Sequence, residues 1–246
     1  ALAELTAGAE AVIHIAGVVN APDRAGFAAG NIDGTRAIVA ATAPGTRFVH
    51  VSSLSAREPR LSIYGWSKRE AEEVVAASAL AWDMVRPPGI YGPGDMEMLD
   101  VFRLARRGFS ITPPAGRASW IHVDDLARLL VVLAETPAER AIYEMDDGRE
   151  GGWTHHAFAQ AVGVALGRSV RPLALTPGLL RLGARIDRLI RGKRAKLTAD
   201  RVAYFCHPDW TVDPAKRPSV ALWTPGIASE TGLRETAESY RAAGLL

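Results

Sequence analysis

Short apolar runs alternate with amphipathic stretches along the first part of the chain. Apolar, β-branched and aromatic residues are typical of buried strands, and we expect strands at 11–17, 46–53, 81–87 and 141–148. Helical spacing and helix-forming residues predict helices at 31–43, 67–79 and 98–108. Residues 119–135 read as a strand that runs directly into a helix. This alternation predicts an α/β fold with a parallel sheet that is covered on both faces.

The pattern changes at about residue 150. From there the chain predicts helices with short connections at 153–166, 177–190, 197–205 and 228–242. We therefore expect a second, smaller and mainly helical lobe.

Composition narrows the class of protein. The 246 residues are 48% hydrophobic and 23% charged, which indicates a globular protein. The 29 basic and 27 acidic side chains nearly balance, so the charge gives no indication of a nucleic-acid partner. One cysteine, Cys206, cannot form an internal disulfide, and no apolar run is long enough to span a bilayer. We expect a cytoplasmic protein.

Candidate chemistry follows the second predicted strand. Ligands of parallel sheets bind beyond the carboxyl ends of the strands, where the doublet Ser52-Ser53 lies. Tyr64 and Lys68 come next, and a spacing of four places them on one helix face. A phenol has a pKa of about 10, and a neighbouring ammonium group lowers it. Ser53 could then hold a substrate oxygen while Tyr64 exchanges its proton, which suits carbonyl/alcohol interconversion with hydride transfer to or from a nicotinamide.

A packing role is the competing interpretation of the tyrosine. A Tyr-x-x-x-Lys spacing occurs on many helices by chance, and a helical tyrosine more often packs than catalyses. The order of strand, Ser-Ser, Tyr-x-x-x-Lys helix and a strand that ends in Arg86-Pro87 favours the catalytic interpretation.

Several segments together resemble the extended short-chain dehydrogenase/reductases, the NAD-dependent epimerase/dehydratase family. They are "VIHIAG", "NIDGTRAIVAA", "FVHVSS" with "YGWSK", "VRPPGIYGPGD" and "WIHVDDLA". The resemblance implies a Rossmann-type doubly wound parallel sheet and NAD or NADP as cofactor. It implies that Ser53 orients the substrate oxygen, that Tyr64 is the acid/base, and that Lys68 binds the nicotinamide ribose and tunes Tyr64. The further cofactor-binding positions that it implies are Ile15, Ala16, Gly17, Asn31, Pro88 and Gly89, with Asn31 either near the cofactor or fixing the adjoining strand.

The resemblance also implies how the chain divides. Residues 1–91 and 119–147 would form the dinucleotide-binding lobe, and residues 92–118 and 148–246 the substrate lobe. A small-molecule substrate would bind between them. Ten residues separate Ser53 from Tyr64, and Pro88 replaces an aromatic residue that is frequent in sugar-nucleotide enzymes of this family. These differences weaken a sugar-nucleotide assignment. The lobe that follows "RPPGIYGPGD" resembles branches of the family that act on sterol-like or other apolar alcohols and ketones.

The Gly-rich turn that binds the pyrophosphate of a dinucleotide does not occur in this sequence. We therefore expect that the N-terminal strands of the sheet are missing, and that these 246 residues alone bind the cofactor weakly or not at all. Two other functions stay open: a non-catalytic binding or assembly subunit of the same fold, and a sugar-nucleotide epimerase/dehydratase.

Other motifs give weaker indications. His155-His156 lacks the neighbours of a metal site, so no metal is expected, and Trp210 and Trp223 are expected to pack. The stretch 175–197 is amphipathic, with apolar residues Leu179, Leu182, Ile186, Leu189 and Ile190 and basic residues Arg181, Arg185, Arg188, Arg191, Lys193 and Arg194. It could bind a membrane surface, but the favoured interpretation is a helix whose apolar face covers the substrate pocket. The sequence leaves the oligomeric state open, a homodimer included.

Overall fold

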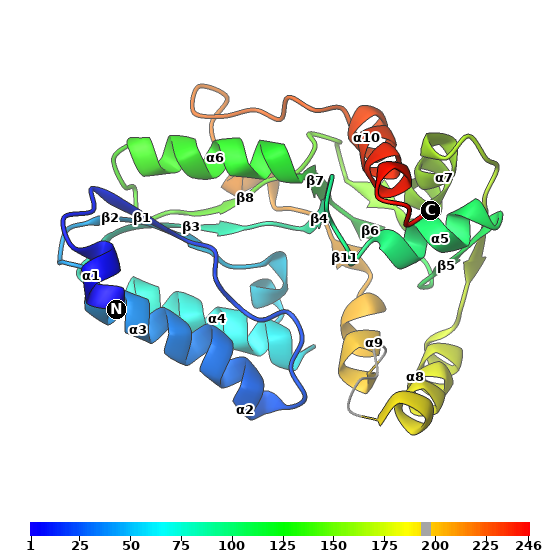
Figure 1. Ribbon diagram of the computed structural model, residues 1–246, viewed down its shortest axis with the longest axis horizontal. Coiled ribbons are helices and arrows are strands. Elements are labelled where there is room, and N and C mark those ends of the chain that lie inside the picture. The colour runs from blue at the N-terminus through cyan, green and yellow to red at the C-terminus, as the bar shows by residue number, and fades with distance from the viewer. Residues whose placement is uncertain (193–197) are drawn as a thin grey trace.

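The computed structural model describes residues 1–192 and 198–246. Within them the main sheet has parallel strands in the order β1–β2–β3–β8 (Figure 1). These strands are β1 (Ala11–His14), β2 (Arg47–Val51), β3 (Ala81–Arg86) and β8 (Ile142–Glu144). The parallel sheet expected from the alternation of apolar runs and helices is thus confirmed.

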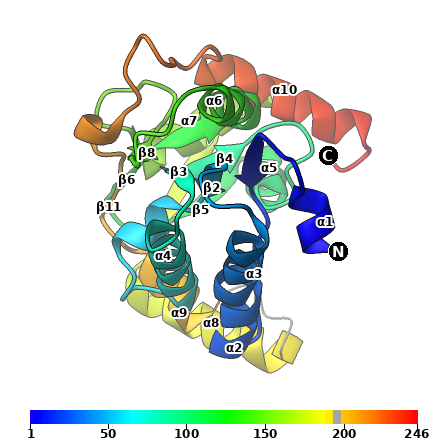
Figure 2. The same cartoon turned by 90° about the vertical axis from the view of Figure 1, so that its left-hand side faces the viewer.

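Helices cover both faces of this sheet, as Figures 1 and 2 show. One face carries α6 (Val123–Glu135), which packs on Val49, Val51 and Val85. The opposite face carries α3 (Gly34–Ala41) and α4 (Ile63–Ala76), which pack on Phe48, Trp82 and Met84. Successive side chains of a strand point to opposite faces of the sheet. The valines therefore face α6, and the aromatic residues face α3 and α4.

The helix expected at 31–43 is longer than the sequence indicates. It begins with α2 (Arg24–Phe27), continues through a π-helical segment (Ala28–Asp33) and ends with α3. Asp23 caps its first turn by accepting a hydrogen bond from the Gly26 N–H at 2.9 Å. Gly26 and Gly30, in the part of this helix that the sequence did not predict, weaken the sequence signal for a helix.

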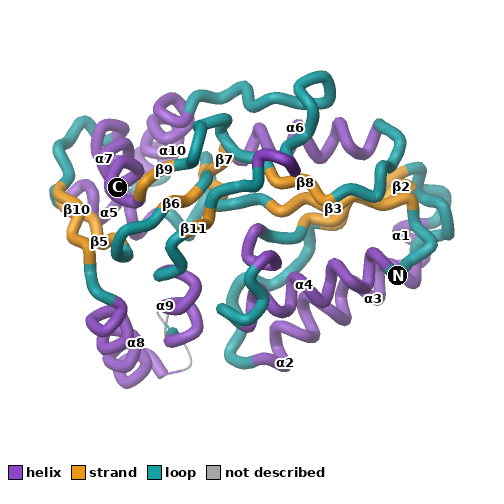
Figure 3. Tube along the Cα trace, turned by 180° about the vertical axis from the view of Figure 1, so that it is seen from behind, coloured by secondary structure: helices purple, strands orange, loops and turns teal. Residues whose placement is uncertain are grey.

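The smaller lobe combines helices with short strands, which the sequence did not predict. Its helices are α5 (Leu99–Arg106), α7 (His155–Ala165), α8 (Pro177–Arg191), α9 (Ala199–Phe205) and α10 (Ser229–Ala242). Its strands pair as β5 (Phe109–Thr112) with β10 (Arg171–Ala174), and as β6 (Arg117–Ala118) with β9 (Trp153–Thr154) and β11 (Asp209–Trp210) (Figure 3). A further parallel pair, β4 (Gly89–Tyr91) with β7 (Trp120–His122), leads toward this lobe. The short α1 (Leu2–Thr6) lies near α3.

The apolar face of α8 is exposed and contributes no residue to the pocket beside Tyr64. Leu182, Leu189 and Ile190 are exposed, so the favoured interpretation of the 175–197 stretch is wrong. The helix instead contacts the protein through Leu180 and Ala184, which pack with Val202 of α9. The last basic residues of this stretch, Lys193 and Arg194, lie outside the described residues.

A buried carboxylate joins the end of the sheet to the smaller lobe. Glu144, at the end of β8, lies 3.6 Å from a nitrogen of each of Arg57, Arg86 and Lys216. It also accepts a hydrogen bond from the Asp213 N–H at 2.9 Å. These contacts connect four stretches that are far apart in sequence.

Candidate active site

The Ser52-Ser53 doublet lies at the carboxyl end of β2, as the sequence predicts. The Ser52 N–H donates to the β3 residue Val85 at 2.8 Å, and the Leu54 N–H donates to the Pro87 carbonyl at 2.9 Å. These bonds hold the doublet beside the end of β3. Ser53 is buried and caps a 3₁₀ turn (Leu54–Arg57) through its side-chain oxygen.

Tyr64 lies in the first turn of α4, which begins four residues earlier than expected. Ser62 caps this helix by accepting a hydrogen bond from the Gly65 N–H at 2.9 Å. The Asp200 carboxylate of α9 accepts from the Ile63 N–H at 2.9 Å. The cap and this long-range contact explain the early start and fix the Tyr64 backbone against α9.

The Tyr64 phenol lies close to the Ser53 hydroxyl, which itself accepts hydrogen bonds from the Ser55 N–H at 3.2 Å and the Ser55 hydroxyl at 3.0 Å. Burial raises the pKa of the Tyr64 phenol above its ordinary value, and a side-chain hydrogen bond with Ser53 opposes that shift. The phenol ring also packs against Phe27, with ring centroids 6.2 Å apart. The structure therefore brings a hydroxyl and a phenol together at the carboxyl edge of the sheet, but it does not show the lowered phenol pKa that the sequence predicts.

Lys68 lies one turn further along α4, with 5% of its surface exposed. Its Nζ donates to the Val51 carbonyl at 2.7 Å. Burial lowers the pKa of Lys68 to about 8, and the nearby Glu72 carboxylate opposes this shift. An amine with this pKa is still mostly protonated at neutral pH.

Glu72 is a buried part of the site that the sequence did not reveal. Its carboxylate accepts from the Ser52 hydroxyl at 2.5 Å and from Arg86 Nε and Nη2 at 2.8 and 2.7 Å. The signal available in the sequence was that Glu72 follows Lys68 by four residues, but this spacing does not indicate whether the carboxylate is buried. The carboxylate fixes α4 to the end of β3 and to the serine doublet.

Two buried histidines, His14 and His50, lie close to Lys68. His14 of β1 and His50 of β2 stack with centroids 5.4 Å apart, and His14 Nε2 lies 3.1 Å from Thr35 Oγ1. Burial lowers the pKa of His14 to about 4 and that of His50 well below its usual value, and the charge of Lys68 adds to both shifts. Both rings are therefore neutral at pH 7 and place no additional positive charge beside the amine.

Ile15, Ala16 and Gly17 follow β1 and are exposed. A Cβ on Gly17 would lie 2.8 Å from Asn31 Oδ1 and 3.7 Å from Lys68 Nζ, so only glycine leaves this space free. Exposed backbone without a side chain beside a lysine is compatible with the close approach of a dinucleotide. A role of Ile15, Ala16 and Gly17 in binding the cofactor stays a prediction.

Asn31 fixes the segment after β1. It accepts from the Val18 N–H at 2.7 Å and donates to the Val18 carbonyl at 3.0 Å. Its amide also donates to Ser67 Oγ at 2.8 Å, and Ser67 donates to the Tyr64 carbonyl at 2.8 Å. Asn31 therefore connects the segment after β1 to α4, the helix that carries Tyr64.

Pro88 and Gly89 follow β3, and Gly89 has a packing reason of its own. A Cβ on Gly89 would lie 2.4 Å from the ring of Trp120, which stacks on Phe158 with centroids 3.9 Å apart. The absence of a side chain at Gly89 is therefore explained by the contact between the lobes. A role of Pro88 and Gly89 beside the nicotinamide stays a prediction.

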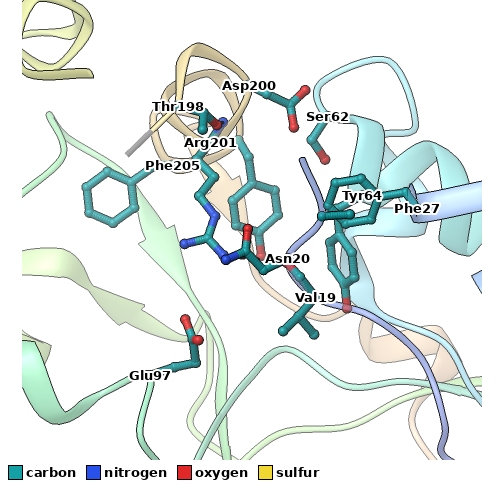
Figure 4. A pocket seen from close by; sticks show the side chains of 12 residues that line it. Val19, Asn20, Phe27, Ser62, Tyr64, Glu97, Thr198, Asp200, Arg201 and Phe205 are labelled. Atoms are coloured by element: carbon teal, nitrogen blue, oxygen red, sulfur yellow. Dashed lines mark hydrogen bonds between the residues drawn. The ribbon is translucent and has the colours of Figure 1, made fainter. Parts of the chain in front are cut away.

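A pocket of about 410 Å³ opens beside Tyr64. Figure 4 shows Tyr64 and Phe27 on one wall and α9 side chains, with Arg201 and Phe205, on the other. Its remaining lining residues are Val19, Asn20, Ala21, Ser62, Glu97, Thr198, Asp200 and Tyr204. The contribution of α9 could not be found from the sequence, because α9 follows Tyr64 by more than a hundred residues and carries no motif.

The remaining candidates behave as follows. Trp210 and Trp223 are buried, which confirms their packing role. Cys206 is a free, partly buried thiol. Among residues 1–192 and 198–246, no group of three His, Cys, Asp or Glu side chains is placed to hold a metal ion, and His155 and His156 belong to none. No helix in those same ranges combines the length and apolarity needed to cross a bilayer.

A parallel, helix-covered sheet with a serine, a tyrosine and a lysine at its carboxyl edge defines the Rossmann-type α/β class. The chain belongs to the NAD dependent epimerase/dehydratase family, whose model matches residues 1–145. The resemblance seen in the sequence motifs is therefore confirmed. The family makes this an enzyme of the oxidoreductase/epimerase kind, with NAD or NADP as its cofactor.

Individual relatives agree with the family. The chain is 39% identical over 256 residues to a ceramide reductase of Caulobacter vibrioides, covering 100% of this chain and 78% of the relative. A UDP-glucuronic acid 4-epimerase from Bacillus cereus in complex with NAD has the same fold, with TM-score 0.74, 15% identity and coverage of 99% and 78%. The human epimerase family protein SDR39U1 with NADPH matches with TM-score 0.73, 18% identity and coverage of 96% and 86%.

Proposed function

We propose that this protein is an NAD(P)-dependent oxidoreductase that interconverts a carbonyl and an alcohol on an apolar, lipid-like substrate. The observation that carries the proposal is that Tyr64 lines a pocket and lies close to the buried Ser53 hydroxyl, with Lys68 on the next turn of the same helix. The substrate class is supported by the aromatic walls of this pocket and by the ceramide reductase that is 39% identical.

In the direction of reduction, the substrate oxygen binds between the Ser53 hydroxyl and the Tyr64 phenol. Both hydroxyls donate hydrogen bonds to it, and these bonds strengthen as negative charge develops on the oxygen. A bound nicotinamide dinucleotide supplies the hydride. Tyr64 then donates its proton to the oxygen, and Lys68 stabilises the resulting phenolate. Because burial raises the pKa of Tyr64, the phenol is fully protonated before this transfer.

The volume of about 410 Å³ suits part of a large substrate, within the range of about 300–1,000 Å³ typical of ligand pockets. Phe27, Tyr204 and Phe205 provide apolar contacts, whereas polar residues such as Asn20 and Glu97 lie at other points of the lining. A long-chain keto lipid could place its carbonyl at Tyr64 and its chain along α9. The sugar-nucleotide epimerase alternative is supported by fold alone, since those structures share 20% identity or less with this chain.

The test is turnover of a long-chain keto lipid in mixed micelles, followed by loss of NADH or NADPH absorbance. Tyr64→Phe should lower kcat by at least about 100-fold, since general acid catalysis contributes about 10²–10⁴-fold, while cofactor affinity in a fluorescence titration stays unchanged. Tyr240→Phe is the matched control: its hydroxyl is buried in α10 and has no hydrogen-bond partner among the described residues.

Three outcomes would contradict the proposal. Turnover by Tyr64→Phe at the wild-type rate would show that Tyr64 is not the proton donor. Epimerisation of a UDP-hexose, seen by NMR, without any keto-lipid reduction would favour the sugar-nucleotide alternative. Cofactor binding without turnover of either substrate would favour a non-catalytic subunit.

A further inference from the structure

Helix α8 exposes an apolar stripe to solvent. Leu179, Leu182 and Ile186 are about half exposed, and Leu189 and Ile190 are 86% and 78% exposed. Their spacing of three and four places them on one side of the helix. Exposed apolar residues that are scattered need no explanation, but a continuous stripe of this kind marks an interaction surface.

The stripe points away from the rest of the protein. At about 100° per residue, Leu180 and Ala184 lie roughly 150° around the helix from the middle of the stripe. Those two residues are buried against Val202 of α9 and are the anchor of α8. The exposed stripe therefore does not belong to the core of the lobe.

Arginines flank the stripe on one side. Arg181, Arg185 and Arg188 are exposed and follow one another at spacings of four and three, which forms a second, basic row beside the apolar one. The whole helix carries four arginines against one aspartate. This charge argues against a second copy of the chain as the partner, because two such faces would bring like charges together, and it matches a surface that is both apolar and anionic.

The stripe lies close to the candidate active site. Helix α9 packs on α8 through Val202 and provides Tyr204 and Phe205 to the pocket, so one helix separates the stripe from Tyr64. Helices α2, α8 and α9 project from the same side of the sheet, opposite α6 (Figures 1 and 2). A surface in contact with the stripe would lie across α8 from α9, whose residues line the pocket.

We propose that α8 docks on an anionic lipid membrane, with the apolar stripe among the acyl chains and the arginines at the phosphate groups, and that this contact delivers a lipid substrate to the pocket. The docking rests on α8 itself, and only the delivery of substrate rests on the proposed function. Apolar burial and electrostatic attraction both contribute to such interfacial binding.

The test is co-sedimentation of the protein with vesicles of phosphatidylcholine containing phosphatidylglycerol, and with vesicles of phosphatidylcholine alone. The protein should bind the anionic vesicles, bind the neutral ones at least about fivefold more weakly, and lose most of this preference at about 1 M salt. The double substitution Leu189→Glu/Ile190→Glu should reduce binding at least about tenfold. Val164→Glu/Val220→Glu is the matched control, because both valines are exposed and lie outside α8, and it should bind as wild type does.

Three results would overturn the proposal: wild-type protein that stays in the supernatant, equal binding by both double variants, or equal binding to both kinds of vesicle. A wild-type dimer in sedimentation velocity that Leu189→Glu/Ile190→Glu converts to a monomer would also overturn it, in favour of a second copy. Turnover of a short-chain, water-soluble keto amide without vesicles reports on the proposed function separately. If the wild-type protein does not turn over this keto amide, the proposed function is contradicted, whereas the docking result is unaffected.

Discussion

Substitution of Glu72 by glutamine tests whether the buried carboxylate positions the catalytic helix. The change keeps the shape of the side chain and removes its charge. In the wild-type protein the carboxylate accepts from Ser52 and, twice, from Arg86. Glutamine presents one acceptor oxygen and turns an N–H₂ group toward donors, so part of this network is lost.

The magnitude follows from burial. Glu72 and Arg86 are each about 4% exposed at the side chain, and breaking a buried pair of this kind costs about 3–5 kcal/mol. Arg86 keeps Glu144 at 3.6 Å, which places the expected loss at the lower end, about 3 kcal/mol. Urea denaturation measures the loss. Glu73→Gln is the matched control, since Glu73 is 60% exposed on the same helix and its pair with Arg69 is worth at most about 0.5 kcal/mol.

A second readout separates positioning from stability. Glu72 raises the pKa of Lys68 against the effect of burial, so removing its charge should lower that pKa further below about 8. If turnover requires protonated Lys68, the alkaline limb of the pH–rate profile should move to lower pH in Glu72→Gln and stay in place in Glu73→Gln. A Glu72→Gln protein with wild-type stability and an unchanged alkaline limb would refute the reasoning.

Two further substitutions probe the same region. Gly17→Ala places a Cβ 2.8 Å from Asn31 Oδ1 and should destabilise the protein by about 1–3 kcal/mol and weaken cofactor binding. Gly34→Ala, whose Cβ would have its nearest atom at 3.8 Å, should leave cofactor binding unchanged and raise stability by up to about 1 kcal/mol, because it lies in a helix. Equal melting and equal cofactor affinity of the two variants would contradict this. Lys68→Met should change the pH dependence of stability. The pKa of Lys68 in the folded protein, about 8, lies below its ordinary value of 10.5, so the buried charge destabilises the fold by up to about 3 kcal/mol below pH 8. This penalty is relieved as the pH rises from 8 to 10.5. The gain in stability over that range should be present in wild type and absent from Lys68→Met in urea titrations at each pH, and parallel curves would rule out the assigned cause.

The sequence predicts those features that depend on local pattern. The strand 46–53 is found as β2 because its buried side chains are β-branched and aromatic on both faces, and Ser53 and Tyr64 lie close together because a parallel sheet brings its loops to one edge. The pair β5–β10 was missed because each strand has four residues and the partner lies some sixty residues away. Such pairing is decided by tertiary packing, which a local pattern does not encode.

The same limit applies to the site. Tyr64 and Lys68 were found because their spacing repeats the helix period. The carboxylate of Glu72 was missed because its importance comes from Arg86 and Ser52, which approach it from other elements. For Tyr64 the sequence indicates the residue but not the direction of its pKa shift, since that depends on how far the surrounding fold buries the ring.

The cluster at Glu144 makes the joint between the lobes stiff. A rotation of the smaller lobe away from the sheet would separate Lys216 and the Asp213 N–H from the Glu144 carboxylate. The fully buried carboxylate would then keep its negative charge with fewer partners, which is costly. Helix α9, in contrast, is seven residues long, packs on α8 through Val202 and accepts the Ile63 N–H at Asp200. The entrance beside Tyr64 is therefore widened at lower cost by moving α9, where a partly buried hydrogen bond is lost, than by moving the whole lobe, where a buried charge is uncovered.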